Sequence, residues 1–293
     1  MLPPFDVTTP NSLDEAVDTL KRLGSNARVL AGGTDLLLDL RTSTAPVGNL
    51  LSLKNLKELK DLQVHDNGEL RIGALVTHRE LENSDLIKNR VPILHDGVSK
   101  IGSVQTRIRG TIGGNICNAL PSADTAAPLL ALNAAVHCYA PQGRRQIPIE
   151  AFYIGPGKSI LKDDELLTHV VIPPSPSPCN GAYLKFTLRA AMDLALLGVA
   201  VFFAMENDKK TCRTVRIALA SAAPTPIRCF EAESVLEGRR LSDDLLTEAG
   251  KVASGEARPR TSWRTTAEYR RELIRVLVPQ AGSLALKRLK DNP

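Results

Sequence analysis

The sequence is poor in aromatic residues, which make up 4% of its 293 positions, and it contains a single tryptophan. This scarcity argues against a stacking surface for single-stranded nucleic acid, and the short basic runs accompany no known nucleic-acid-binding module. No apolar run approaches the ~20 residues that cross a bilayer, and the first residues lack the basic start and apolar core of a secretory signal. We therefore expect a cytoplasmic protein with no membrane span and no nucleic-acid partner.

Cysteine is also scarce, and the five copies form no C-x-x-C pair: Cys117, Cys138, Cys179, Cys212 and Cys229. An odd, scattered set argues against a disulfide framework and against a structural zinc site. The five histidines show no spacing typical of metal ligands either. We predict no metal site in the chain.

What the chain does have is the composition of an ordinary globular protein, with 43% hydrophobic and 24% charged residues and a net charge of +5. Its length suffices for two or three compact units, because single cores stop growing near ~250–300 residues. The clearest linker is the segment 173–178, in which four of six residues are proline. We predict three parts, at residues 1–55, 56–175 and 176–293.

Apolar spacing and turn residues predict a mixed α+β chain. Ser12 and Glu15 outline a capping box at the start of a helix that ends at Gly24. Further helices are predicted over 92–101, 124–132, 228–237, 242–253 and 266–277. Strands are predicted over 27–30, 49–53, 70–75, 134–140, 165–172, 182–188, 196–205 and 214–220. We expect Asp124 in the first turn of its helix, and the apolar run 196–203 also fits a buried helix.

Two glycine-rich stretches stand out, Ala31-Gly32-Gly33-Thr34-Asp35-Leu36 and Arg109-Gly110-Thr111-Ile112-Gly113-Gly114-Asn115-Ile116. We call them the first glycine loop (residues 31–36) and the second glycine loop (residues 109–116), and we expect each to follow a strand or extended run. Glycine permits positive φ, and successive N–H groups in such a turn form a nest that holds phosphate. Each stretch alone is more typical of a plain turn than of a ligand site, and neither has Rossmann or P-loop spacing. Together they predict a ligand with two phosphates, such as a dinucleotide.

With these loops and further matching blocks at 29–36, 111–116, 121–132, 183–189 and 193–195, the sequence resembles a known family. It is similar to the FAD-binding medium subunits of the xanthine dehydrogenase (molybdenum hydroxylase) family, which includes bacterial carbon monoxide dehydrogenases. The resemblance runs from about Pro3 to about Leu289. It implies an α+β fold, in which a two-part FAD-binding domain of the vanillyl-alcohol-oxidase/PCMH type precedes a C-terminal domain with an antiparallel sheet and helices.

The resemblance also implies which residues bind FAD: Leu30, Ala31, Gly32, Gly33, Thr34, Asp35, Leu36, Thr111, Gly113, Gly114, Asn115, Ser122, Asp124, Ile160, Leu161 and Lys185. The two glycine loops would hold the pyrophosphate from both sides, the second through backbone N–H groups and the Asn115 amide. Asp124 would contact the ribose or adenosine side, although an aspartate there also fits a helix N-cap. Lys185 would lie at the isoalloxazine ring or be an exposed strand lysine, and Ile160 and Leu161 would pack near the ring or form strand-edge core.

The function implied is that of an electron-transfer subunit of an oxidoreductase, with no catalytic residue of its own. A small subunit with [2Fe–2S] clusters would supply electrons, and a large subunit with the molybdenum cofactor would oxidise the substrate, in a heterotrimer or its dimer. The acceptor would be NAD+, a quinone or another carrier, since Met192 stands where animal xanthine enzymes have an acidic residue. Cys117 runs directly into residues 118–122, which leaves no room for a cluster in this chain. The alternative is a stand-alone FAD- or nucleotide-binding module without redox partners.

Overall fold

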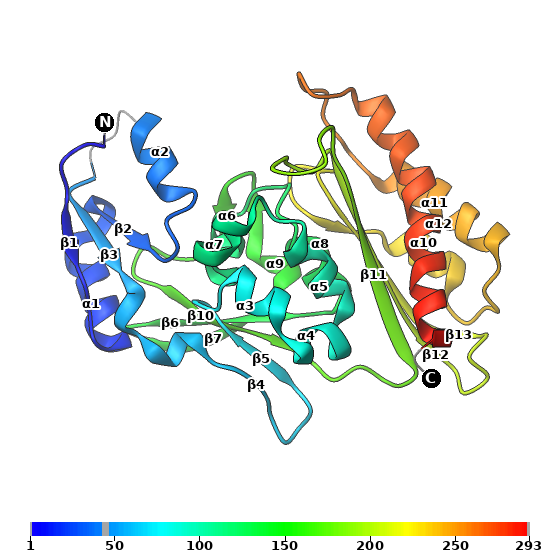
Figure 1. The fold of residues 1–293 in the computed structure, drawn as a ribbon, viewed down its shortest axis with the longest axis horizontal. Helices are drawn as coiled ribbons and strands as arrows, with labels where there is room; N and C mark the ends of the chain where they lie inside the picture. Colours follow the sequence, from blue (N-terminus) through cyan, green and yellow to red (C-terminus); the bar gives the residue numbers. More distant parts are fainter. Residues whose placement is uncertain (1, 43–46, 292–293) are drawn as a thin grey trace.

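The computed structural model describes residues 2–42 and 47–291, and it shows three parts that follow one another in chain order across the molecule (Figure 1). None of the helices in these ranges combines the length and the apolar composition needed to cross a lipid bilayer. The fold is α+β, as predicted, with helices packed on separate sheets.

The N-terminal part is a small βα unit whose three parallel strands have the order β1-β3-β2. Its elements are β1 (Asp6–Thr8), α1 (Leu13–Leu23), β2 (Ala27–Leu30), α2 (Leu36–Thr42) and β3 (Asn49–Ser52). The Ser12 side chain accepts a hydrogen bond from the Glu15 N–H, which confirms the predicted helix start. The Glu15 carboxylate accepts a hydrogen bond from the N–H of Asn11 and not from that of Ser12. The return bond of the capping box therefore reaches one residue further toward the N-terminus than expected. The predicted helix and both predicted strands are confirmed.

The middle part contains a five-stranded antiparallel sheet of order β4-β5-β10-β6-β7, covered on one face by short helices (Figure 1). The sheet strands are β4 (Leu62–Val64), β5 (Leu70–Gly73), β6 (Ala135–Ala140), β7 (Gly143–Pro148) and β10 (Leu166–Ile172), and β8 (Tyr153–Gly155) pairs with β9 (Lys158–Ser159). The helices are α3 (His78–Asn83), α4 (Asp85–Arg90), α5 (Pro92–Ser99), α6 (Val104–Arg109), α7 (Ile112–Cys117), α8 (Ala126–Ala131) and α9 (Ile149–Phe152). Of these, α4, α6, α7 and α9 were not predicted, because each is too short to show a helical period.

The C-terminal part is a four-stranded antiparallel sheet with α12 on one face and α5 and α8 on the other. Its elements are β11 (Cys179–Phe186), β12 (Leu197–Met205), β13 (Cys212–Ala220), β14 (Ile227–Arg228), α10 (Phe230–Leu236), α11 (Asp243–Glu256) and α12 (Ala267–Asp291). Side chains of β12 alternate between two cores, with Ala200 and Phe202 on one and Val199 and Val201 on the other. The run 196–203 is therefore a strand buried on both faces, and its alternative as a buried helix is wrong.

The last helix, α12, continues to Asp291, well beyond the predicted end at 277. Pro279 lies inside it and removes one helical hydrogen bond. Gly250 of α11 faces this point, because a Cβ on Gly250 would lie 3.0 Å from the Arg275 carbonyl oxygen and 3.0 Å from Pro279 Cδ. Close packing at Pro279 and burial of Ala285 further along stabilise the helix beyond its predicted end at residue 277.

Polar contacts tie the three parts together, and two of them join distant helices and strands. Tyr139 of β6 donates a hydrogen bond to Asp14 of α1, and Arg288 of α12 forms an ion pair with Asp96 of α5 at 2.7 Å. The core of the middle part continues into Tyr183 and the inner face of β12. The division at residues 55 and 175 stays a prediction, because packing is continuous across both positions.

Candidate functional site

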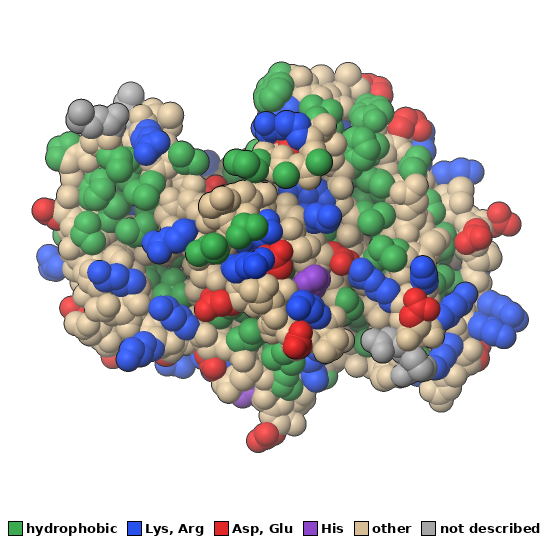
Figure 2. All heavy atoms as spheres, viewed as in Figure 1, with side chains coloured by type: hydrophobic (Ala, Val, Ile, Leu, Met, Phe, Trp, Pro, Cys, Tyr) green, Lys and Arg blue, Asp and Glu red, His purple; other side chains and the backbone are tan. Residues whose placement is uncertain are grey.

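A cavity of about 780 Å³, within the size range of ligand sites, lies between the N-terminal part and the middle part and extends to residues 185 and 192–194 of the C-terminal part. Figure 2 shows the surface hollowed between these parts. Fourteen of the sixteen predicted site residues line the cavity: Ala31, Gly32, Gly33, Thr34, Asp35, Leu36, Thr111, Gly113, Gly114, Asn115, Ser122, Asp124, Leu161 and Lys185. The structure thus brings together residues that are up to 154 positions apart in sequence, from Ala31 to Lys185.

The other two predicted residues, Leu30 and Ile160, are not among the residues that line the cavity. Leu30 packs in a small apolar cluster with Leu40 and Leu50 instead. Ile160 is 38% exposed, and its N–H donates to the carbonyl oxygen of Phe152. The structure therefore gives no support to Ile160 as a ring contact, whereas Leu161 faces the cavity.

The first glycine loop is an open turn after β2, as expected. Gly33 has φ +77°, a conformation that favours glycine. No described residue accepts a hydrogen bond from the backbone N–H groups of Gly32, Gly33, Thr34 or Asp35. Among the described residues, the only side-chain hydrogen bond within this loop runs from Thr34 Oγ1 to Asp35 Oδ2, at 3.3 Å. Four neighbouring donors at a cavity wall form the kind of cradle that binds an anion.

The second glycine loop differs from its prediction. It follows α6 rather than a strand, and Thr111 is the N-cap of α7. The N–H groups of Ile112 and Gly113 donate to carbonyl oxygens after β5, at 3.0 Å each, and the Gly114 N–H donates to Thr111 Oγ1 at 3.1 Å. These backbone donors are used by the fold, so the prediction that they hold a phosphate does not fit.

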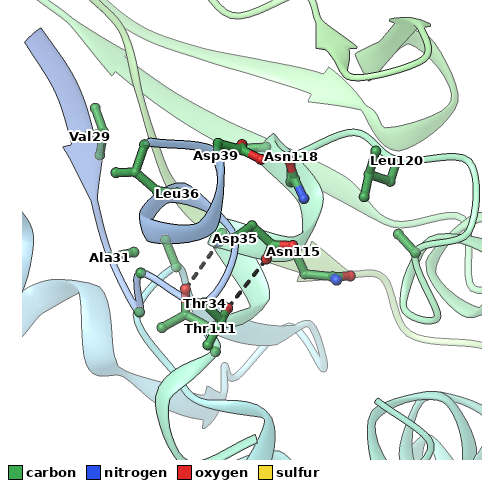
Figure 3. A pocket seen from close by; sticks show the side chains of 18 of the residues that line it. Val29, Ala31, Thr34, Asp35, Leu36, Asp39, Thr111, Asn115, Asn118 and Leu120 are labelled. Atoms are coloured by element: carbon green, nitrogen blue, oxygen red, sulfur yellow. Dashed lines mark hydrogen bonds between the residues drawn. The ribbon is translucent and has the colours of Figure 1, made fainter. Parts of the chain in front are cut away.

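Side chains of the second glycine loop and its continuation supply polar groups instead. Asn115 Oδ1 accepts a hydrogen bond from Thr125 Oγ1 at 2.6 Å, which fixes the orientation of the amide. Figure 3 shows the Asn115 and Asn118 side chains reaching into the cavity opposite the first glycine loop. With Ser122, they place neutral donors across from the cradle of free N–H groups.

The two glycine loops lie against each other, most closely at Gly32. A Cβ on Gly32 would lie 2.0 Å from the carbonyl oxygen of Arg109 and 3.0 Å from Gly110 Cα. Glycine at position 32 is therefore required by the contact between the loops and not only by a ligand. This contact fixes the distance between the two glycine loops at the floor of the cavity.

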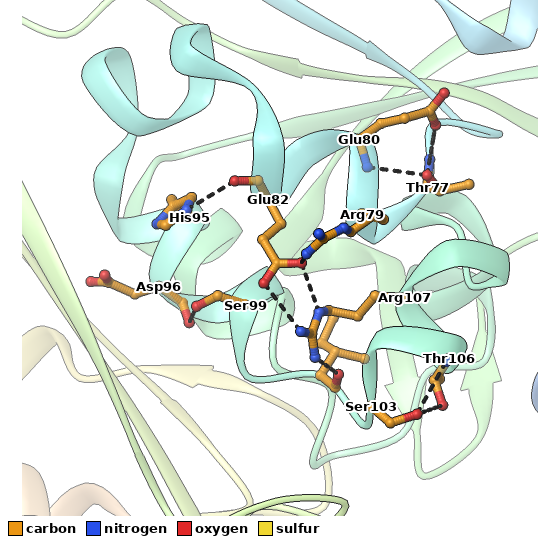
Figure 4. A network of polar contacts seen from close by, with 11 residues as sticks. Thr77, Arg79, Glu80, Glu82, His95, Asp96, Ser99, Ser103, Thr106 and Arg107 are labelled. Atoms are coloured by element: carbon orange, nitrogen blue, oxygen red, sulfur yellow. Dashed lines mark hydrogen bonds and ion pairs between the residues drawn. The ribbon is translucent and has the colours of Figure 1, made fainter.

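A polar network behind the second glycine loop holds α3 and α6 together (Figure 4). Arg107 Nε and Nη2 donate to the two carboxylate oxygens of Glu82 at 2.9 and 3.1 Å, and Nη1 donates to the Ile101 carbonyl oxygen at 2.9 Å. The guanidinium groups of Arg107 and Arg79 hold the pKa of Glu82 below its usual value, although burial acts in the opposite direction. A buried bidentate pair of this kind gives the loop a rigid support.

At the far side of the cavity, Lys185 and Asp124 form a buried ion pair. Lys185 Nζ lies 2.7 Å from Asp124 Oδ2 and also donates to the Lys100 carbonyl oxygen at 2.9 Å, and the side chains are only 6% and 8% exposed. The Tyr183 hydroxyl donates to Asp124 Oδ1 at 2.8 Å. Burial raises the pKa of Asp124 above its usual value, while Lys185 and Tyr183 act in the opposite direction.

These contacts correct two alternatives. Helix α8 begins at Ala126 with Thr125 as its N-cap residue, so Asp124 is neither in the first turn nor a cap. Lys185 is not an exposed strand lysine. The contact of Asp124 with ribose and the contact of Lys185 with the ring stay predictions. Arg189 and Asp193 form an ion pair at 3.6 Å.

His78 was missed by sequence reasoning. It lines the cavity, its side chain is almost fully buried, and its backbone N–H donates to the Gly110 carbonyl oxygen at 2.9 Å. Its Nδ1 has no hydrogen-bond partner among the described residues. Burial, helped by the charge of Arg107, lowers its pKa to about 4. The Thr77–Glu80 capping box places His78 at a helix start, but a capping box does not indicate which face of the helix a side chain occupies.

Two family models match this chain. The model for the "FAD binding domain in molybdopterin dehydrogenase" matches residues 3–175, and that for the "CO dehydrogenase flavoprotein C-terminal domain" matches residues 182–282. The first alone covers more than half of the chain. The FAD cofactor and the two-domain α+β architecture are thereby confirmed.

Relatives and solved structures agree. The xanthine dehydrogenase FAD-binding subunit of Escherichia coli O157:H7 is 34% identical over 285 residues, which cover 96% of this chain and 97% of the relative. The carbon monoxide dehydrogenase medium chain of Afipia carboxidovorans is 33% identical over 287 residues, 98% of each chain. A solved carbon monoxide dehydrogenase structure from Hydrogenophaga pseudoflava superposes with a TM-score of 0.94 at 30% identity, covering 98% of this chain and 99% of that one. The chain therefore belongs to the FAD-binding medium subunits of the molybdenum hydroxylase family, the family of the xanthine and carbon monoxide dehydrogenases, and is an oxidoreductase subunit.

Proposed function

We propose that this subunit holds FAD along the cavity, with the diphosphate against the first glycine loop and the isoalloxazine ring toward Lys185. The observation that carries this placement is the row of free N–H groups at residues 32–35, since a dianionic bridge satisfies several donors at once. Asn115, and Ser122 further along the wall, would donate from the opposite side. Thr34 completes the cradle with its hydroxyl group.

The buried pair of Lys185 and Asp124 defines what the other end of the cavity does. A lone cation beside the flavin would stabilise its reduced anionic form strongly, but Asp124 neutralises most of the charge of Lys185. The pair therefore orients the ring through fixed hydrogen-bonding groups and has a modest effect on its potential. The bound flavin itself supplies the exchange between one-electron and two-electron transfer.

In the complete enzyme, we infer that a small subunit with [2Fe–2S] clusters delivers electrons to this chain, and that a large subunit with the molybdenum cofactor oxidises the substrate. The relatives support this assembly by their printed names as medium chains and FAD-binding subunits that match along 97–98% of their length. A heterotrimer or its dimer follows from that assembly. NAD+, a quinone or another carrier accepts the electrons.

The placement of the diphosphate is tested by Asn115→Asp. Aspartate keeps the acceptor for Thr125 and leaves the buried hydrogen bond intact, but it replaces the amide donor with a negative charge. We expect the affinity for FAD to fall by about tenfold or more, because like charges in contact repel strongly. Titration of the deflavinated protein with FAD, followed by quenching of flavin fluorescence, measures the change.

Asn133→Asp is the matched control, since Asn133 is exposed and outside the cavity. It makes the same change in charge and is expected to bind FAD like the wild type. Equal affinities for all three proteins would overturn the placement. The assembly is tested separately by co-purification: a yellow monomer that never associates with molybdenum- and iron-containing chains would favour a stand-alone FAD-binding module.

A further inference from the structure

The single tryptophan of the chain lies on an exposed turn of the C-terminal part. We call residues 261–266 the Trp263 turn. The N–H of Ser262 donates to the Thr265 carbonyl oxygen at 2.9 Å, and the N–H of Thr265 returns a bond to the Ser262 carbonyl oxygen at 3.2 Å. This tight two-residue turn places Trp263 and Arg264 at its tip. Trp263 is 86% exposed, and the Arg264 guanidinium lies 4.9 Å from the centre of its ring.

The sequence around Trp263 is rich in arginine. The segment 257–267 contains Arg258, Arg260 and Arg264 and no acidic residue, and the first two side chains are exposed. Exposure of a large apolar ring to water does not stabilise the fold. Tryptophan and arginine are the residues most enriched at the energetic centres of protein interfaces. The turn therefore has the features of a contact site for an acidic protein.

The Trp263 turn is connected to the rim of the flavin cavity. Buried Arg270 donates to the carbonyl oxygen of Leu196 and, at 3.4 Å, to Ser262 Oγ. Residues 187–195 immediately precede Leu196, and within them Met192 lines the cavity while Met192 and Leu188 are more than 60% exposed. Figure 1 shows the turn before α12 and the loop after β11 on the same side of the molecule.

We propose that the Trp263 turn and residues 187–194 form a docking surface for a small acidic electron-carrier protein, which accepts the electrons of the flavin. This inference rests on the proposed function and narrows its acceptor. Permanent subunit interfaces are large, whereas electron-transfer partners meet on small surfaces. The surface proposed here is a single turn and one short loop, with arginine side chains beside a few exposed apolar ones, and it fits the second kind. Arginine side chains would steer the acidic carrier to the cavity rim. Because the reduced flavin gives up two electrons, two oxidised carrier molecules take one each, and the flavin protons go to solvent.

The probe is oxidised rubredoxin, a small acidic one-electron carrier, offered to the complete FAD-loaded enzyme complex. Binding is measured by surface plasmon resonance, and reduction of rubredoxin by the chemically pre-reduced complex is measured by stopped-flow absorbance. For Trp263→Ala we expect the dissociation constant to rise by about tenfold or more. For Arg260→Glu with Arg264→Glu we expect the association rate at low salt to fall by about tenfold and its salt dependence to flatten.

Two controls separate the surface from general effects. Arg239→Glu with Arg240→Glu makes the same change in net charge at exposed positions outside the docking surface, and it is expected to leave binding within about twofold of the wild type. Basic cytochrome c is expected to bind equally weakly to wild type and Trp263→Ala. The visible spectrum of every variant is expected to show full flavin content, because none of the substituted residues lines the cavity.

Several results would overturn the proposal. Rubredoxin binding that is unchanged in both turn variants, or lowered equally by the 239/240 control, would show that the surface does not dock it. A dimer of the complex, or binding of single-stranded oligothymidylate, that is lost in Trp263→Ala would assign the surface to a second copy or to nucleic acid. Failure of the proposed function has a different signature, namely a wild-type protein without flavin.

Discussion

The two glycine loops have similar sequences and opposite roles in the structure. In the first loop, residues 32–35 leave four successive N–H groups without a described acceptor. In the second loop, Thr111 caps a helix and the glycine N–H groups bond within the protein. Glycine therefore leaves backbone donors open in one loop and allows close packing in the other. The comparison teaches that a glycine-rich pattern does not tell which of these two uses it has.

Close packing also explains why the loops face the same cavity. A Cβ on Gly113 would lie 2.7 Å from Ala74 Cβ, so this glycine lets α7 approach the end of β5. Gly32 in turn lets the first loop touch Arg109. The second loop is thus a rigid floor, fixed to the sheet, on which the first loop rests.

The proposed difference between the two loops is tested first by Gly32→Ala, for which we expect the largest effect. Its Cβ would overlap a backbone oxygen, which cannot rotate away, so the loops must separate at a cost of about 3 kcal/mol. We expect a lower melting temperature of the deflavinated protein and loss of FAD from the purified one. Differential scanning calorimetry and the visible spectrum measure the two effects.

Gly114→Ala is the matched control. Its Cβ would meet only Thr111 Oγ1 at 3.0 Å and Ala31 at 4.0 Å, and the residue lies inside a helix, where alanine is favoured over glycine. We expect this variant to be as stable as the wild type. Equal destabilisation of both variants would show that the loops do not differ in the way described.

A second, smaller effect is expected from the buried imidazole beneath the loops. The folded protein holds the pKa of His78 at about 4, below the ordinary value of 6.5, because burial and Arg107 disfavour its charged form. The native state is therefore favoured fully above pH 6.5, and this contribution is lost as the pH falls from 6.5 toward 4. Between pH 7 and pH 5 the loss amounts to about 2 kcal/mol.

His78→Leu removes the titrating group without breaking a recorded side-chain hydrogen bond among the described residues. We expect the free energy of unfolding of this variant, measured by urea titration of the deflavinated protein, to depend less on pH than that of the wild type. Parallel decreases in both proteins would mean that His78 is not held neutral.

Much of the fold could be predicted because long elements carry a period. The helix that begins after Ser12 and the three long strands of the C-terminal sheet, β11, β12 and β13, were predicted within a few residues. The short helices α6 and α7 could not be predicted, since six residues contain less than two turns and Gly113 and Gly114 are poor helix formers. Tertiary contacts decide their conformation: α6 packs on α3, and the N–H groups at the start of α7 bond to the residues after β5.

The sequence predicted which residues line the candidate site, but it did not predict which contacts each of them makes. Fourteen residues came from resemblance to a family, and they lie around one cavity. The pairing of Asp124 with Lys185 joins residues 61 positions apart, and no local pattern indicates it. His78 was missed for a similar reason, because its burial results from the packing of α3 under the second loop.

The smallest expected effects come from substituting the threonine of each glycine loop, and they test the same difference between the loops. Thr111→Val removes the oxygen that accepts from the Gly114 N–H, and loss of an N-cap costs about 1 kcal/mol. Thr34→Val removes a hydroxyl that donates only to Asp35 at 3.3 Å, so the stability of the deflavinated protein should change by less than about 0.5 kcal/mol. FAD affinity is expected to fall in Thr34→Val, because this hydroxyl belongs to the open cradle. If urea titrations showed Thr34→Val to be the less stable variant and Thr111→Val to be neutral, the first loop would be structural and the second would be the one that binds.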